Sequence, residues 1–175
     1  MQKNENENIL LNIIQHLNDK KIDYIVAGGV AVVLQGVERL TMDLDLAVDQ
    51  SKENIQKFID AMSELGLVPR LPVPAETLLD EDKKRVMVEE KNALVFTFID
   101  PKVPLRQVDF FMAPGLSYDE LLPEIEEFDL DGTKIKVVSK KKLVELKLNV
   151  DPMRDKDLFD IKELQRLINS EKNKK

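Results

Sequence analysis

This sequence of 175 residues contains no cysteine and no tryptophan, and His16 is its only histidine. The lack of cysteine excludes disulfides, zinc–thiolate sites and a cysteine nucleophile. One histidine cannot supply a metal site built from several imidazoles, and the helical pattern around His16 predicts a position at a helix surface or boundary. Aromatic residues make up only 5% of the chain. We therefore expect an aliphatic core and few stacking platforms for exposed bases.

Long apolar runs and a surplus of positive charge are also absent. No stretch approaches the roughly 20 apolar residues of a membrane-spanning helix. The N-terminal sequence MQKNENENILL lacks the basic-then-apolar pattern of a secretory signal. We therefore expect a cytoplasmic protein with no membrane partner. The net charge is −7, so an overall basic surface for nucleic acid is missing.

The hydrophobic pattern predicts a mixed α/β chain of the α+β class. We expect helices over residues 5–20, 30–36, 52–65, 140–150 and 155–169, and strands over 23–27, 43–49, 85–90, 93–99 and 106–112. Asp131-Gly132 predicts a hairpin turn between two short strands, and the proline-rich stretch 67–82 predicts a loop with one helical turn. This order indicates a small mixed sheet flanked by helices. We expect a core over 1–138 and a C-terminal helical pair over 139–175 that completes the same domain.

Two features near the N-terminus predict one functional site. A hydrophobic run ends at Gly28-Gly29, and Asp43 and Asp45 stand at the head of the next hydrophobic run. Residues two apart on an extended strand point to the same face, so the two carboxylates reach one volume. A helix that opens at Gly29 offers free N–H groups to a phosphate. Together these features predict a site for a nucleoside triphosphate and its divalent metal.

A third carboxylate, Asp109, lies among apolar residues in the sequence QVDFFM. Burying a carboxylate is costly unless it is paired or bound to a metal, so we expect Asp109 to complete the metal site with Asp43 and Asp45. Two metals at such a site serve in-line displacement at phosphorus. Each signal alone has an ordinary explanation: a solvent-facing acid pair, a salt-bridged strand residue or a plain strand-to-helix turn. The prediction rests on their coincidence.

Basic residues supply the counterpart of these acids. Arg39 and Thr41 either contact a phosphate or are a surface arginine and a turn hydroxyl, and the sequence leaves both interpretations open. Lys147, on the predicted helix 140–150, is placed to neutralise a triphosphate as a point charge. Arg154 and Asp157 are three residues apart, and for Arg154 we favour an ordinary intrahelical ion pair. For Asp157 we favour a role at the nucleotide.

The string GG…RLTMDLDLAVD, followed by the aspartate in QVDFF, resembles the nucleotidyltransferase superfamily with the polymerase-beta-like fold. The residues that match its signature are Gly28, Gly29, Asp43, Asp45 and Asp109. The C-terminal sequence RDKDLFDI, together with Lys147, further resembles the nucleotidyltransferase toxins of bacterial abortive-infection (AbiEii/AbiGii-like) systems. The residues that fit the toxin motif are Arg154, Lys156, Asp157 and Asp160.

This resemblance implies transfer of a nucleoside monophosphate from a nucleoside triphosphate to an acceptor hydroxyl, with Mg²⁺ or Mn²⁺. In the toxin branch the acceptor is often transfer RNA or the partner antitoxin. An acidic surface, however, suits a cationic small molecule such as an aminoglycoside better than RNA. A catalytically weak nucleotide-binding module is a further alternative, and the presence of all three carboxylates speaks against it.

Overall fold

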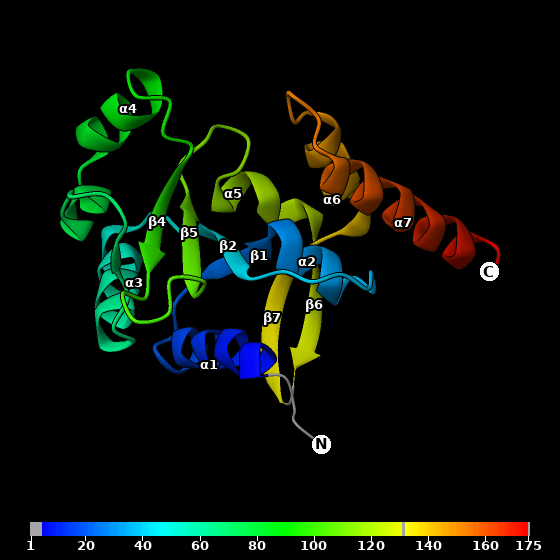
Figure 1. Ribbon diagram of the computed structural model, residues 1–175, viewed down its shortest axis with the longest axis horizontal. Coiled ribbons are helices and arrows are strands. Elements are labelled where there is room, and N and C mark those ends of the chain that lie inside the picture. Colours follow the sequence, from blue (N-terminus) through cyan, green and yellow to red (C-terminus); the bar gives the residue numbers. More distant parts are fainter. Residues whose placement is uncertain (1–4, 131, 175) are drawn as a thin grey trace.

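A computed structural model describes residues 5–130 and 132–174, so Asp131 of the expected turn lies outside the described residues. The strands form one mixed sheet in the order β3-β4-β5-β2-β1-β7-β6 (Figure 1). The strands are β1 (Tyr24–Ala27), β2 (Asp43–Val48), β3 (Val68–Pro69), β4 (Val95–Ile99), β5 (Gln107–Phe111), β6 (Ile125–Leu130) and β7 (Thr133–Val138). The helices are α1 (Glu5–Asp19), α2 (Gly28–Leu34), α3 (Lys52–Glu64), η1 (Ala75–Leu79), α4 (Glu81–Glu89), α5 (Tyr118–Leu121), η2 (Leu122–Glu124), α6 (Lys140–Leu148) and α7 (Asp155–Lys172).

The centre of the sheet places the candidate residues side by side. All four residues of β1 are buried, as expected for a strand covered on both faces. Strand β1 runs antiparallel to β2, and Ala27 pairs with Asp45. Strand β2 runs parallel to β5, and Asp45 pairs with Asp109. Neighbouring strands are about 4.8 Å apart, so the register brings the two aspartates together at the same end of the sheet.

The helices extend the molecule on both sides of this centre. Helices α3 and α4 lie at one end and α6 with α7 at the other, while α2 lies near the middle (Figure 1). Helix α2 contacts both β2 and α6. Helix α6 therefore packs against the helix that the glycine turn begins. None of the helices within 5–130 and 132–174 is long and apolar enough to cross a membrane.

The predicted fold class is confirmed, because a mixed sheet flanked by helices is present, with a C-terminal helical pair. The predicted strand over 85–90 is wrong: these residues belong to α4 and its end. The side chain of Asp80 caps this helix by accepting from the Lys83 N–H at 3.0 Å. Lys84 is a residue of this helix, and its ammonium donates to Gln50 Oε1 at 2.7 Å. Gln50 follows the end of β2, so the hydrogen bond connects the helix to the sheet. The expected division of the domain into a core over 1–138 and a C-terminal helical pair over 139–175 stays a prediction.

Candidate active site

The Gly28-Gly29 turn is shaped by what lies against it. Gly28 has φ +59°, a left-handed conformation that favours glycine, and a Cβ there would overlap the carboxylate of Asp45. A Cβ on Gly29 would lie 2.5 Å from Thr41 Oγ1 and 3.3 Å from the Arg39 guanidinium. Both glycines therefore make room for side chains of the candidate site. This close packing explains why the position after β1 is Gly-Gly.

The three carboxylates lie on adjacent strands with different exposure. Asp43 is exposed at the start of β2, and Asp45 is half-buried. Asp109 is buried, with 9% of its surface exposed. Asp109 is held by two donors: the Thr97 hydroxyl at 2.6 Å and the Gln107 amide at 3.1 Å. Its burial is thus compensated by hydrogen bonds from β4 and β5. The sequence analysis did not single out Thr97, although a polar residue between Phe96 and Phe98 was a usable signal.

Burial and the neighbouring carboxylates perturb the pKa of Asp45. Burial, then the negative charges of Asp109 and Asp43, raise the pKa of Asp45 to about 7. A hydrogen bond from the Gly29 N–H and the positive charge of Lys147 act in the opposite direction. The Gly29 N–H, which we expected to be free for a phosphate, is therefore directed to Asp45. Clustered like charges of this kind favour binding of a cation.

The role of Asp43, Asp45 and Asp109 as metal ligands stays a prediction. Among the described residues, no group of three or more His, Cys, Asp or Glu side chains is arranged to hold a metal ion. Thr97 and Gln107 each donate to one oxygen of Asp109, and both oxygens keep a lone pair that a metal could use.

The raised pKa of Asp45 predicts how stability depends on pH. Between about pH 4 and pH 7 the folded chain retains a proton on Asp45 that the unfolded chain releases, so stability falls as pH rises through this window. Asp45→Asn lacks this titration and therefore does not lose stability in this way. The quantity to measure is the melting temperature of Asp45→Asn minus that of the natural chain, both without divalent metal. We expect this difference to be larger at pH 8 than at pH 5. The control is Asp60→Asn, an exposed change on α3. Melting curves with the same pH dependence for Asp45→Asn and the natural chain would contradict the prediction.

A buried ionic network connects the C-terminal helices with the loop before β2. The Lys147 ammonium lies 2.8 Å from Asp160 Oδ2 and 3.2 Å from Asp157 Oδ1. The Arg39 guanidinium also donates to Asp160 Oδ2, at 2.5 Å. The side chains of both aspartates are 0% exposed. The sequence analysis placed Asp160 in a motif but missed its contact with Arg39, 121 positions away.

The remaining predicted residues fall as follows. Arg154 forms the expected ion pair with Asp157, its Nε donating to Oδ2 at 2.6 Å. Asp157 therefore contacts two cations, Arg154 and Lys147, and a direct role at the nucleotide stays a prediction. Thr41 packs against Gly29. Arg39 is not a free surface arginine, because its guanidinium reaches both Gly29 and Asp160.

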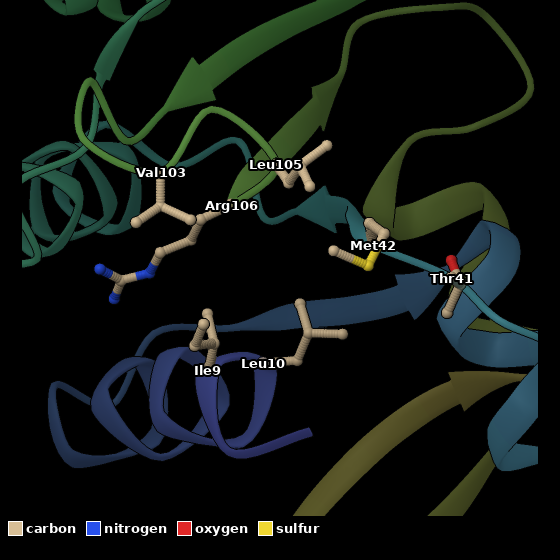
Figure 2. Close-up of a pocket in the computed structure, with 7 residues that line it drawn as sticks. All are labelled: Ile9, Leu10, Thr41, Met42, Val103, Leu105 and Arg106. Atoms are coloured by element: carbon tan, nitrogen blue, oxygen red, sulfur yellow. The ribbon is translucent and has the colours of Figure 1, made fainter. Parts of the chain in front are cut away.

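A small apolar cavity adjoins the site at Thr41 and Met42. Figure 2 shows its lining, which comes from α1, the loop before β2 and the loop before β5: Ile9, Leu10, Thr41, Met42, Val103, Leu105 and Arg106. Its volume is about 50 Å³. Ligand pockets for small molecules span roughly 300–1,000 Å³, so this cavity is too small for an acceptor. It is a packing gap between α1 and the sheet.

Several solved structures share the fold of this chain. The lincosamide antibiotic adenylyltransferase LnuA, with lincomycin bound, aligns with a TM-score of 0.62 at 18% identity over 92% of this chain and 97% of its own. ANT(2″)-Ia, in complex with adenylyl-2″-tobramycin, aligns with a TM-score of 0.59 at 14% identity, covering 95% and 92%. A putative nucleotidyltransferase from Thermotoga maritima aligns with a TM-score of 0.56 at 16% identity, over 97% of this chain and 96% of its own. At these identities the likeness concerns the fold.

The sequence comparisons are more specific. No curated protein sequence matches the chain significantly. A family model described as aminoglycoside-2″-adenylyltransferase matches residues 9–164. These findings support the superfamily predicted from the sequence, and they do not support a closer relation to the abortive-infection toxins. The chain belongs to the aminoglycoside-2″-adenylyltransferase family and is a nucleotidyltransferase.

Proposed function

We propose that this enzyme transfers the adenylyl group of ATP to a hydroxyl of a small cationic acceptor of the aminoglycoside type. The observation that carries the proposal is the position of Asp45, which lies against Gly28 and beside Asp109 on the next strand. This places the acidic side chains for a cation directly against the glycine turn, beside Arg39, which can bind a polyphosphate. Arg39 and Lys147 provide positive charge at the same place.

The residues fit a divalent cation such as Mg²⁺ or Mn²⁺. Asp43 and Asp45 are the accessible ligands, and the mutual repulsion that raises the pKa of Asp45 is relieved by a bound cation. Asp109 would join them through the oxygen lone pairs that Thr97 and Gln107 leave unused. The metal, when bound, neutralises phosphate charge and polarises the phosphorus centre.

The protein residues have separable roles in the transfer. The acceptor oxygen forms a bond to the α-phosphorus, the bond from that phosphorus to the β-phosphate oxygen breaks, and pyrophosphate leaves. Gly28 and Gly29, which we assign to the phosphate end of the site, give Asp45, Thr41 and Arg39 room to lie against the turn. Arg39 and Lys147 balance the charge on the leaving pyrophosphate. To Asp109, which lies beside Asp45 on the neighbouring strand, we assign acceptance of the proton of the acceptor hydroxyl.

The choice of acceptor rests on charge and on the family. The net charge of −7 attracts cationic molecules and repels RNA. The family model is named for aminoglycosides, and the solved structures with this fold include complexes with lincomycin and adenylyl-2″-tobramycin. These observations favour a small-molecule acceptor over transfer RNA or an antitoxin, which the toxin motif suggested. No comparison supports a toxin.

The test is transfer of label from α-³²P-ATP with Mg²⁺ to three acceptors offered separately: tobramycin, lincomycin and transfer RNA. We expect labelled tobramycin, no labelled RNA, and no product from the Asp43→Asn/Asp45→Asn variant. Label on RNA alone would revive the toxin interpretation. Tight ATP binding without transfer to any acceptor would indicate a catalytically weak module and would overturn the proposal.

A further inference from the structure

Asp160 links two cations that come from distant parts of the chain. Its Oδ2 accepts from the Arg39 guanidinium at 2.5 Å and from the Lys147 ammonium at 2.8 Å. Arg39 belongs to the loop before β2, Lys147 to α6 and Asp160 to α7. The Asp160 side chain is 0% exposed. One carboxylate oxygen therefore occupies both cations at once.

The arrangement at Asp160 is not optimised for stability. Its other oxygen, Oδ1, is buried and has no hydrogen-bond partner. An unsatisfied buried acceptor destabilises the fold, and buried ion pairs are often no more stable than apolar replacements of the same size. A carboxylate held on one oxygen, with the other left unpaired, is suited to being exchanged for another anion.

Both cations also face the proposed phosphate site. The Arg39 guanidinium lies 3.3 Å from the point where a Cβ of Gly29 would stand. The Lys147 charge acts on Asp45, whose carboxylate packs against Gly28. Asp160 engages Arg39 through Nη1, while Nη2 of the same guanidinium faces the glycine turn. A phosphate at the turn and Asp160 therefore compete for the charge of the same two cations.

We propose that Asp160 is an internal substitute for phosphate: it holds Arg39 and Lys147 in the free enzyme, yields them to the polyphosphate, and takes them back as pyrophosphate leaves. This inference rests on the proposed function, since it assigns the two cations to the phosphates of the nucleotide. Its consequence is a limit on product affinity. Each departing pyrophosphate is replaced by a carboxylate that is already in place, which favours release.

The experiment measures the dissociation constant of pyrophosphate with Mg²⁺, by calorimetry, for the natural chain and for Asp160→Asn. Asparagine keeps the shape and one acceptor oxygen but removes the competing charge. We expect about 10-fold tighter binding in Asp160→Asn. The matched control is Asp155→Asn, which removes the same charge from an exposed position on the same helix, and we expect it to stay within about twofold of the natural chain. Equal or weaker binding by Asp160→Asn would overturn the proposal.

A second comparison separates competition from a general effect on the fold. In a chain that carries Arg39→Met and Lys147→Met, adding Asp160→Asn should no longer tighten pyrophosphate binding, because the contested cations are gone. A gain that persists in this background would contradict the proposal.

A measurement on the natural chain covers the case in which Asp160→Asn does not fold. With ¹⁵N-lysine labelling, the ammonium resonance of Lys147, assigned through Lys147→Met, should shift when pyrophosphate and Mg²⁺ are added. An unchanged resonance at saturation would overturn the proposal. Pyrophosphate binding needs no acceptor, so the two proposals fail separately: the expected affinities without any adenylyl transfer would contradict only the proposed function.

Discussion

Asp43→Asn and Asp45→Asn are each expected to reduce nucleotide transfer by on the order of 10³-fold, the largest effect predicted for this chain. Both side chains are near the glycine turn, and Asp45 packs directly against Gly28. Asparagine keeps the size of the side chain but removes the charge that a divalent cation needs. The measurement is the initial rate of label transfer from α-³²P-ATP to the best acceptor at saturating Mg²⁺.

The control for these variants is Asp60→Asn, which removes an equal charge from an exposed position on α3. We expect it to transfer label at the natural rate. Melting curves of all three variants establish that the fold is retained, which matters because Asp45→Asn is expected to stabilise the protein at high pH. Transfer that survives in both Asp43→Asn and Asp45→Asn would remove these residues from the reaction.

Gly28→Ala is expected to have the second largest effect, on activity and stability together. Gly28 has φ +59°, and its new Cβ would overlap the Asp45 carboxylate. The left-handed conformation costs an alanine about 1–2 kcal/mol, and the overlap additionally displaces Asp45 from Asp109. We expect about 100-fold slower transfer or less activity still, together with a lower midpoint of urea denaturation.

Gly66→Ala separates backbone strain from this overlap. Gly66 follows α3 with φ +73°, and no atom lies within 4 Å of a Cβ placed there. Gly66→Ala should lower the free energy of unfolding by the cost of the left-handed conformation alone, about 1–2 kcal/mol. Transfer should continue at the natural rate. If Gly28→Ala and Gly66→Ala lose activity equally, the contact between Gly28 and Asp45 is not what matters.

The local parts of the site could be predicted from the sequence because they depend on short spacings. Gly28-Gly29 after an apolar run, and Asp43 and Asp45 at the head of the next one, carry their geometry in the alternation of a strand. Asp109 was recognisable because a carboxylate in an apolar strand needs a partner. The structure supplies that partner as Thr97 and Gln107.

Long-range contacts and one local conflict could not be predicted in this way. The contact of Arg39 with Asp160 spans 121 positions and depends on how α7 packs, which no spacing encodes. Residues 85–90 carry valines that favour a strand, but the Asp80 cap and the buried Lys84 stabilise a helix instead. The motif RDKDLFDI indicated the toxins, whereas the family match over 9–164 indicates antibiotic adenylyltransferases. A short motif of charged residues is too weak to separate branches of one superfamily.

The measurement that tests the central claim most directly is the melting temperature of the natural chain with each of the four ribonucleoside triphosphates, with and without Mg²⁺. A ligand that binds the folded state must raise its stability, and no acceptor has to be known. We predict a rise with ATP that requires Mg²⁺ and is lost in Asp43→Asn/Asp45→Asn. The absence of a shift with every nucleotide, or an equal shift in the variant, would contradict a metal-dependent triphosphate site at these carboxylates.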